Sequence, residues 1–386
     1  MRGFIVVIDS FGIGYAPDAE KFDDVGANTL ASVSKSKYLN IPNMTKMGLY
    51  NIDGVSSNLK VTNTASIARL KEISMGKDST IGHWEMAGVI SNSPLPTFPN
   101  GFPKEVIKEF EKEIGRGTIV NKVYSGTDVL EDYGAEHVKT GKLIVYTSVD
   151  SVFQIAAHED IVSPEKLYDY CRVARKILKG KYGVGRVIAR PFVGEVGSFE
   201  RTPNRHDFSI EPPATTMLDV LQSKGKKTIS VGKIYDLFAH RGIDEYYLTK
   251  SNKDGILKTI DIAKNCDFDG LCYTNLVDFD TKYGHRRDVD GYAKALSEFD
   301  YYLSELCNNL KDDDFLMITA DHGCDPLFKG TDHTREYVPL IIYGKKIKPI
   351  NLGTIEGFNV IAKTACSLLG VKSDFNAKDV SNLVKE

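Results

Sequence analysis

The chain has 386 residues, of which 42% are hydrophobic, and a formal net charge of −3 at pH 7. This length favours two or three domains, because a domain usually holds about 100–200 residues. The near-neutral charge argues against a nucleic-acid partner, since proteins that bind polyanions usually carry a strongly basic domain. Neither a signal peptide nor a membrane span is expected, because the first apolar run stops at Asp9 and no stretch approaches about 18 apolar residues.

The cysteines are scattered along the chain without a CxxC pair. They are Cys171, Cys266, Cys272, Cys307, Cys324 and Cys366. Several fall in apolar runs, so we interpret them as buried free thiols. Free thiols are typical of a reducing compartment, which predicts a cytoplasmic protein. Nothing in the sequence indicates an obligate protein partner.

Short β-rich runs that end in polar or acidic residues alternate with helical patterns. The runs cover residues 3–8, 227–231, 270–276, 315–319 and 338–343, and helices are expected at 215–223, 254–264 and 291–310. This alternation predicts an α/β fold whose central sheet is mostly parallel and flanked by helices. In such sheets ligands collect at the carboxyl ends of the strands, so Asp9 and Asp321 should point into one crevice.

Two proline-rich segments, at 91–103 and 210–213, interrupt this pattern. The sequence between them predicts helices of its own at 104–114 and 164–178, and strands at 143–147 and 187–189. Because proline-rich breaks often mark domain boundaries, we predict a smaller α/β cap domain at 93–212. It is inserted into a core domain formed by 1–92 and 213–386.

A set of acidic and imidazole side chains near four predicted strand ends forms a candidate metal site. The set is Asp9, Asp280, His285, Asp321, His322 and His333. A lone aspartate after a strand is usually a helix cap or a turn residue, but three of the chain's eight histidines fall in these motifs. Oxygen and imidazole ligands without a thiolate favour manganese, zinc or iron(II), and the set is large enough for two ions. Asp321 and His322 can reach one ion only where their strand has ended, because adjacent strand residues face opposite sides.

The segment GKDSTIGHWEMAG, residues 76–88, supplies a candidate nucleophile. Ser79 and Thr80 carry hydroxyls, and Gly76 and Gly82 permit tight turns and a close approach of the backbone to a ligand. A hydroxyl is a poor nucleophile until a base or a metal ion activates it. Together with the metal site, this segment indicates in-line phosphoryl transfer through a phosphoserine.

Two other interpretations of this segment can be compared with the sequence. It does not match a Walker A loop, because the first glycine of that loop is absent and Asp78 separates the lysine from the serine. Asp78 or Ser79 could instead cap a helix that continues through Trp84 and Met86. A helix cap is compatible with a nucleophile here, because the field at a helix N-terminus favours a bound phosphate.

Six sequence blocks resemble the phosphopentomutases, which belong to the alkaline phosphatase superfamily. The blocks are VVIDSFGIG with APDA, GKDSTIGHWEMAG, YTSVDSVFQIAAHE, RPFVGEVGSFERTPNRHDF, TNLVDFDTKYGHRRDVDGY and TADHGCDPLFKGTDHTREYVPLI. They run in family order from Val6 to Ile341, and the spacing of DFD-x4-H, ADHG and GTDHTRE is the most specific part. The resemblance implies an alkaline-phosphatase-like core with an inserted cap.

The resemblance also implies roles for the site residues. It assigns one metal ion to Asp9, Asp321, His322 and the Ser79 oxygen. It assigns the other ion to Asp280, His285 and His333. Ser79 falls where the family carries its phosphorylated residue, although the family pattern has threonine there, and this departure leaves Thr80 as an alternative.

Six further residues fit a sugar phosphate, mainly because of the resemblance. They are Ser148, Asp150, Arg190, Arg201, Arg205 and Lys233. Arginine forks match phosphate with two parallel hydrogen bonds, although an arginine in a polar loop is usually a solvated surface charge. The serine and the aspartate could bind ribose hydroxyls, and the lysine follows a core strand from which it could reach the distal phosphate.

The implied activity interconverts ribose 1-phosphate, or 2-deoxyribose 1-phosphate, with the 5-phosphate through a phosphoserine enzyme. It implies two divalent metal ions, with Mn²⁺ favoured, and a hexose 1,6-bisphosphate or pentose 1,5-bisphosphate primer. Two alternatives use the same core, namely a metal-dependent phosphatase and a cofactor-independent phosphoglycerate mutase. A non-catalytic protein that binds metal or sugar phosphate is a third alternative, and it would bind its ligand without turnover.

Overall fold

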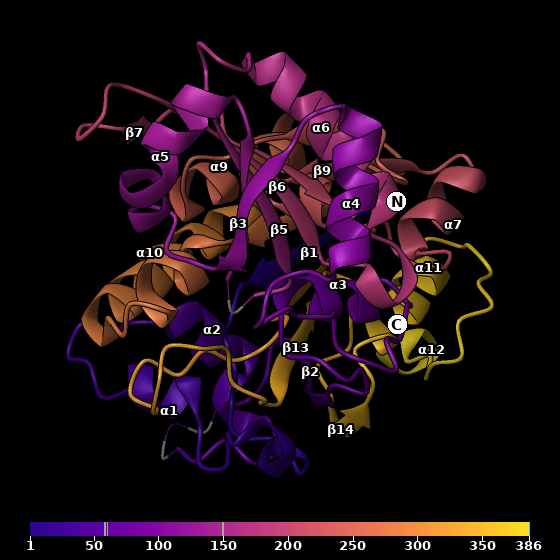
Figure 1. Cartoon of the computed structure of the whole chain (residues 1–386). Coiled ribbons are helices and arrows are strands. Elements are labelled where there is room, and N and C mark those ends of the chain that lie inside the picture. Colours follow the sequence, from indigo (N-terminus) through magenta and orange to yellow (C-terminus); the bar gives the residue numbers. More distant parts are fainter. Residues whose placement is uncertain (58, 60, 149, 386) are drawn as a thin grey trace. The chain divides into compact units, whose positions relative to one another are not determined.

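The structure, a computed structural model, describes residues 1–57, 59, 61–148 and 150–385. Figure 1 shows the whole chain, which divides into two compact units. The first unit comprises Met1–Pro94 and Pro212–Glu386, and the second comprises Leu95–Glu211. The second unit is therefore an insertion in the sequence of the first.

The described part of the first unit is built on an eight-stranded sheet with the strand order β10-β9-β11-β1-β12-β13-β2-β14. The strands are β1 (Arg2–Ile8), β2 (Ser66–Lys71), β9 (Lys227–Val231), β10 (Glu245–Tyr247), β11 (Gly270–Leu276), β12 (Phe315–Thr319), β13 (Val338–Tyr343) and β14 (Asn351–Glu356). The first five strands of that order are parallel, β13 is antiparallel to both of its neighbours, and β14 is parallel to β2. The mostly parallel sheet expected from the sequence is confirmed.

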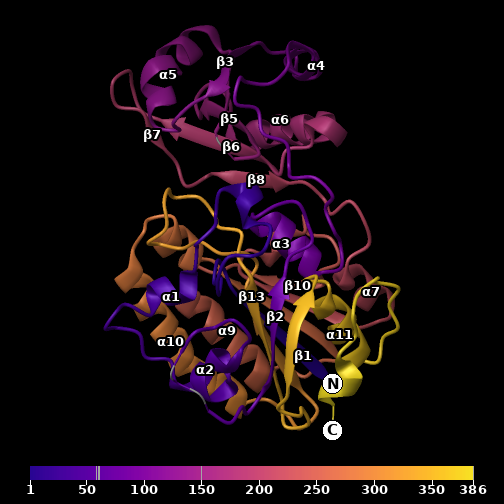
Figure 2. The same cartoon turned by 90° about the horizontal axis from the view of Figure 1, so that it is seen from below.

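Helices cover both sides of this sheet (Figure 2). One side carries α1 (Thr29–Val33), α2 (Pro42–Met47), α9 (Asn252–Asn265) and α10 (Val289–Asn308). The other carries α3 (Ser79–Met86), α7 (Met217–Ser223), α8 (Ile234–Leu237) and α11 (Val360–Leu368). Strand β1 is buried along its whole length because both faces of the sheet are covered.

Shorter elements complete the first unit. They are η1 (Ala19–Phe22), η2 (Leu49–Asn51), the π-helical turn η4 (Phe279–Gly284) and α12 (Ser381–Val384). The helix predicted at 291–310 is α10, which Asp288 caps by accepting a hydrogen bond from the N–H of Gly291. None of the helices in the described ranges has the length and apolar character needed to cross a bilayer.

The described residues of the second unit form a six-stranded mixed sheet with the order β3-β4-β5-β6-β7, in which β8 also pairs with β6. The strands are β3 (Thr118–Val123), β4 (Leu143–Thr147), β5 (Val152–His158), β6 (Arg186–Val193), β7 (Glu200–Arg201) and β8 (His206–Ser209). The helices are α4 (Lys104–Ile114), α5 (Asp128–Thr140), α6 (Pro164–Ile177) and the short η3 (Gly180–Tyr182). The unit is thus α/β in its own right.

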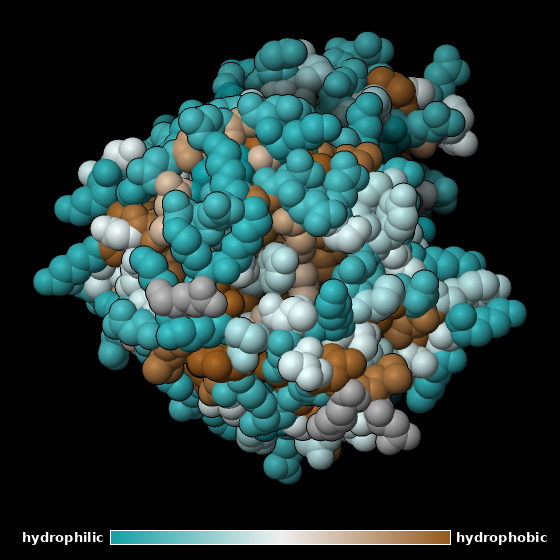
Figure 3. Space-filling model, turned by 180° about the vertical axis from the view of Figure 1, so that it is seen from behind, coloured by the Kyte–Doolittle hydropathy of each residue, from teal (hydrophilic) through white to brown (hydrophobic). Residues whose placement is uncertain are grey.

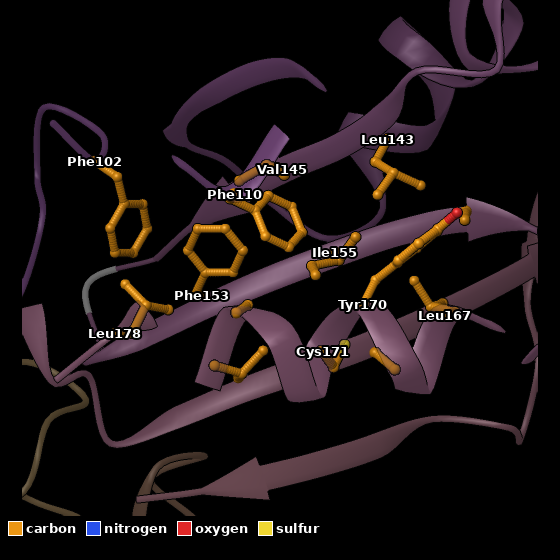
Figure 4. Close-up of a cluster of buried hydrophobic side chains, with 14 of the residues drawn as sticks. Phe102, Phe110, Leu143, Val145, Phe153, Ile155, Leu167, Tyr170, Cys171 and Leu178 are labelled. Carbon is orange, nitrogen blue, oxygen red and sulfur yellow. The ribbon is translucent and has the colours of Figure 1, made fainter. Parts of the chain in front are cut away.

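Alternate residues of β4 and β5 fill two separate apolar clusters in this unit. Leu143, Val145 and Phe153 belong to the cluster that also holds side chains of α4 and α6 (Figure 4). Ile144 and Tyr146 belong to the cluster that holds side chains of α5. This alternation is the two-residue period of a strand, so the sheet is covered on both faces.

The face of the molecule that Figure 3 shows is mostly hydrophilic, with small hydrophobic areas between the hydrophilic ones.

All six cysteines are free thiols. Four are buried, as expected from the sequence, but Cys266 and Cys307 are partly exposed. For these two, the prediction of full burial is wrong.

Candidate metal centre and nucleophile

The carboxyl ends of β1 and β12 bring two carboxylates together. Asp9 directly follows β1, and Asp321 comes two residues after the end of β12, which is the parallel neighbour of β1. Ligand atoms of Asp9, Asp321 and His322 all lie within 4.8 Å of one another. The backbone N–H of Ser10 donates a hydrogen bond to Asp321 Oδ1 over 3.0 Å, which fixes the orientation of that carboxylate.

His322 faces both carboxylates with one ring nitrogen. Its Nδ1 lies 3.0 Å from the carbonyl oxygen of Gly323, so Nδ1 carries a proton and donates it there. Nε2 then faces Asp9 Oδ1 at 3.4 Å and Asp321 Oδ2 at 3.3 Å. The hydrogen bond from Nδ1 to Gly323 is typical of metal-binding histidines, in which one ring nitrogen binds the metal and the other is held by a hydrogen bond.

Asp280 lies in η4, the π-helical turn that follows β11, and it forms a second cluster with two histidines. Its Oδ2 is 3.3 Å from His285 Nε2, and its Oδ1 is 3.3 Å from His333 Nε2. His285 donates through Nδ1 to the carbonyl oxygen of Thr331 over 2.6 Å. The ring centroid of His333 is 4.6 Å from that of His285 and 4.0 Å from that of His322 in the first cluster, so the two clusters adjoin.

Ser79 is the first residue of α3 and points its hydroxyl at this centre. Ser79 Oγ lies 3.2 Å from His322 Nε2. Asp78 is the helix cap, because its side chain accepts hydrogen bonds from the N–H groups of Thr80 and Ile81. The cap and the candidate nucleophile are therefore adjacent residues with separate tasks.

Gly82 brings α3 close to the end of β12. A Cβ added at Gly82 would overlap the carbonyl oxygen of Asp321 and lie 3.1 Å from its Cβ. The sequence predicted a close approach at this glycine to a ligand, and the close approach in the structure is to Asp321. Glycine therefore lets the helix that carries Ser79 pack against a candidate metal ligand.

Several buried polar atoms in the two clusters point to bound cations. Within the described residues Asp9 Oδ1, Asp280 Oδ1, Asp321 Oδ2 and His333 Nε2 have no hydrogen-bond partner. A buried carboxylate oxygen without a hydrogen-bond partner is unfavourable unless a counter-charge or a metal ion satisfies it. The donor set fits two divalent ions, because two groups of three carboxylate and imidazole ligands each lie within 4.8 Å of one another, namely Asp9, Asp321 and His322, and Asp280, His322 and His333.

The electrostatics of the first cluster agree with this fit. Burial and the neighbouring Asp321 carboxylate raise the pKa of Asp9. Burial also opposes ionisation of Asp321, but the charges of His322 and His83 hold the pKa of Asp321 well below its usual range. Burial would lower the pKa of His322, and the two carboxylates raise it well above the usual value instead. The raised pKa values of Asp9 and His322 both reflect the negative charge gathered here, which a bound cation would offset.

Three residues at this centre were not identified from the sequence. Asn275 Nδ2 donates to Asp9 Oδ2 over 2.9 Å and lies 3.3 Å from His83 Nε2. Cys324 Sγ lies within 4.8 Å of ligand atoms of Asp280 and His285. His83 could have been found, because it lies one helical turn after Ser79 and so shares its face.

The three arginines expected to bind sugar phosphate gather within the second unit. The charges of Arg190, Arg201 and Arg205 all act on the hydroxyl of buried Tyr146, opposing the rise in its pKa that burial causes. Arg205 makes two hydrogen bonds of 2.8 Å to Asp207. An arginine held by a carboxylate in this way is oriented, but it is also partly neutralised.

The other three residues expected to bind substrate are Ser148, Asp150 and Lys233, and they do not gather in one unit. Ser148 Oγ accepts a hydrogen bond from the N–H of Asp150 over 3.2 Å in the second unit. Lys233 precedes α8 in the first unit, and its charge acts on Asp9 by lowering the pKa of that carboxyl. The binding roles of all six residues stay predictions.

The fold and the clustered candidate ligands are typical of a metalloenzyme, and the model of the metalloenzyme superfamily matches residues 1–373. A phosphopentomutase of Lachnoclostridium phytofermentans is 55% identical over 375 residues, which cover 96% of each chain. A phosphopentomutase of Acetivibrio thermocellus is 51% identical over 380 residues and 98% of each chain. The chain therefore belongs to the phosphopentomutase family.

A solved structure of a Pyrococcus horikoshii protein resembles the fold. It covers 97% of this chain and 99% of its own, with a TM-score of 0.51 and 15% sequence identity. That likeness concerns the fold alone. It agrees with the α/β architecture expected from the sequence.

Proposed function

We propose that this chain interconverts pentose 1-phosphates and pentose 5-phosphates, with ribose and 2-deoxyribose as the sugars. The observation that carries the proposal is the Ser79 hydroxyl, which lies 3.2 Å from His322 Nε2 at the junction of two carboxylate–imidazole clusters. Relatives that share half or more of the sequence over nearly the whole chain are phosphopentomutases, which supports the same activity here.

Two divalent metal ions belong to this proposal. The first is held by Asp9, Asp321, His322 and the Ser79 oxygen. The second is held by Asp280, His285 and His333. Mn²⁺ is the ion we favour, because it accepts both carboxylate and imidazole ligands. When bound, the ions supply positive charge that neutralises the phosphoryl oxygens and stabilises the ionised Ser79 hydroxyl.

The reaction starts from enzyme phosphorylated on Ser79. The C1 hydroxyl of a pentose 5-phosphate attacks the phosphorus, so its O–P bond forms while the bond to Ser79 Oγ breaks, and its proton leaves to solvent. The 1,5-bisphosphate then reorients. Ser79 Oγ attacks the C5 phosphoryl group, the P–O5 bond breaks, O5 takes up a proton, and pentose 1-phosphate remains.

The N-terminus of α3 suits the phosphorylated state. Helix α3 begins at Ser79, so a phosphoryl group on this residue lies at the positive end of the helix dipole. A hexose 1,6-bisphosphate or a pentose 1,5-bisphosphate would prime Ser79. We assign the second unit as the cap, whose task is to keep water from hydrolysing the phosphoserine while substrate is bound.

Sugar-phosphate recognition is assigned to the remaining predicted residues. Arg190, Arg201, Arg205 and Lys233 would bind the phosphate that is not transferred, and Ser148 and Asp150 would bind sugar hydroxyls. The partners are small-molecule pentose phosphates. We place the reaction in the cytoplasm, because all six cysteines are free thiols and a reducing compartment preserves them.

The proposal is tested by locating the phosphoryl group on the protein. Wild type, Ser79→Ala and the neighbouring control Thr80→Ala are incubated with Mn²⁺ and a hexose 1,6-bisphosphate, digested and analysed by mass spectrometry. Wild type and the control should carry phosphate on residue 79, and Ser79→Ala should lose both phosphate and turnover, by about a thousandfold or more. Phosphate on Thr80 in the Ser79→Ala protein, with turnover retained, would refute the assignment.

A second assay separates the mutase from its alternatives. Ribose 5-phosphate, 3-phosphoglycerate and p-nitrophenyl phosphate are supplied side by side to the metal-loaded protein. Conversion of ribose 5-phosphate to the 1-phosphate should dominate. Faster release of inorganic phosphate from p-nitrophenyl phosphate would favour a phosphatase, and isomerisation of 3-phosphoglycerate would favour the other mutase.

A further inference from the structure

Cys324 places a sulfur atom beside the second cluster. It comes two residues after His322, and it is 1% exposed. Its Sγ and ligand atoms of Asp280 and His285 all lie within 4.8 Å of one another. A Cβ added at Gly284 would lie 2.9 Å from Cys324 Sγ, so the glycine at the end of η4 leaves room for the sulfur.

The backbone around Cys324 is held firmly. Its N–H donates to the carbonyl oxygen of Ser10 over 3.1 Å and is 3.2 Å from Thr29 Oγ1. Its Sγ lies 3.7 Å from the carbonyl oxygen of Asp332, which the thiol proton can contact. The sulfur is therefore directed to one place, next to Asp280 and His285.

A second observation at the same place points to a cation. The Asp280 side chain is only 4% exposed; its Oδ2 faces His285 Nε2 at 3.3 Å, and its Oδ1, which faces His333 Nε2 at 3.3 Å, has no hydrogen-bond partner in the described ranges. His285 already uses Nδ1 to donate to Thr331, so its Nε2 is the nitrogen that faces Asp280. An ion bound between these two side chains would have Cys324 Sγ within reach.

We propose that Cys324 is a sulfur ligand for a thiophilic divalent ion bound at Asp280 and His285, such as Co²⁺, Zn²⁺ or Cd²⁺. On binding, the Sγ–metal bond forms and the thiol proton leaves to solvent, with no change of oxidation state. Softer ions gain more from a thiolate than Mn²⁺ does, so Cys324 makes this half of the metal centre selective for them. The inference rests on the metal centre proposed above, but on no step of the mutase reaction.

The absorption spectrum of the Co²⁺ protein tests the sulfur contact. Full-length protein is stripped with a chelator and loaded with Co²⁺ as wild type, Cys324→Ser and the control Cys266→Ser. We expect visible d–d bands in all three proteins. A near-ultraviolet sulfur-to-cobalt charge-transfer band should be present in wild type and the control and absent from Cys324→Ser.

The outcomes distinguish two failures. Wild type that shows d–d bands without the charge-transfer band binds Co²⁺ but refutes the sulfur ligand. Wild type without d–d bands refutes the metal centre and with it this inference. The ¹¹³Cd spectrum of the wild-type protein needs no variant: a resonance in the region of sites with only nitrogen and oxygen ligands would also overturn the proposal.

Affinities then test selectivity. Cys324→Ser should lower the affinity for Cd²⁺ by about tenfold or more and change the affinity for Mn²⁺ by less than about threefold. Equal losses for both ions would mean that Cys324 only supports the packing of the site, and the selectivity would be refuted.

Discussion

His83 donates a hydrogen bond from Nδ1 to the backbone carbonyl oxygen of Ser79, one turn earlier in α3, over 2.8 Å. The other nitrogen, Nε2, lies 3.3 Å from the amide Nδ2 of Asn275. The same amide donates to Asp9 Oδ2. One ring and one amide therefore connect the helix that carries the nucleophile to a candidate metal ligand.

Replacing His83 by alanine should weaken metal binding and turnover together. The change removes one hydrogen bond from the Ser79 carbonyl and one from the Asn275 amide, which costs about 1–3 kcal/mol of unfolding free energy. Loss of such an outer contact usually lowers metal affinity by about 10–100-fold. A titration with Mn²⁺, in which the electron paramagnetic resonance signal of the unbound ion is followed, measures the metal affinity directly. His83→Asn, whose amide can still donate to Ser79, should recover part of the affinity; alanine with wild-type affinity would contradict this account.

Gly82→Ala should separate α3 from the end of β12. The new methyl group would overlap the carbonyl oxygen of Asp321, which cannot move without shifting a candidate metal ligand. We expect a loss of about 1–3 kcal/mol in unfolding free energy, as for other overpacked sites, and a loss of turnover. Gly117→Ala is the matched control, because there the nearest atom is the flexible Lys142 Cγ at 3.4 Å. The argument fails if Gly82→Ala keeps the wild-type melting temperature and metal affinity.

The strands that support the site could be predicted because they are buried on both faces. β1 and β12 are largely apolar runs that can be recognised in the sequence. The observed bounds of β12, Phe315–Thr319, are the predicted ones, and β1 begins at Arg2, one residue before its predicted start. The edge strand β14 (Asn351–Glu356) was not predicted. It is mostly exposed, contains Gly353 and shifts register against β2, so its sequence lacks the alternation that marks a strand.

The candidate ligands could likewise be found from their position after strands, but their immediate surroundings could not. Nothing in the sequence marks the π-helical turn that directs Asp280 at His285. Cys324 resembles a small apolar core residue, and its approach to Asp280 depends on the packing of Gly284, which only the folded chain shows. Contacts between segments far apart in the sequence leave no local pattern.

Metal binding should strengthen as the pH rises. In the metal-free protein, the hydrogen bonds to Asp280 and then to Cys324 raise the pKa of His285 to about 11. The ring is therefore protonated at neutral pH, and an ion that binds Nε2 must displace this proton. For each proton displaced, the affinity for Mn²⁺ should rise by about tenfold per pH unit between about pH 6 and about pH 8. His285→Asn should show a smaller slope, and a wild-type affinity that does not change with pH would disprove proton release.

Glu336 should make the metal-free fold less stable as the pH rises through the weakly acidic range. Burial raises the pKa of its carboxyl to about 7, although Thr29, Thr334 and Gly14 donate hydrogen bonds to it. The folded chain binds this proton more tightly than the unfolded chain does. The proton's contribution to the free energy of unfolding is therefore complete below about pH 4.5 and is lost by about pH 7. Glu336→Gln cannot titrate. Urea unfolding with a chelator present measures the free energy of unfolding of wild type and of Glu336→Gln. The difference, wild type minus variant, should fall by about 3 kcal/mol between about pH 4.5 and about pH 7. A relative stability that rises with pH would show instead that the hydrogen bonds hold the carboxylate ionised and its pKa low.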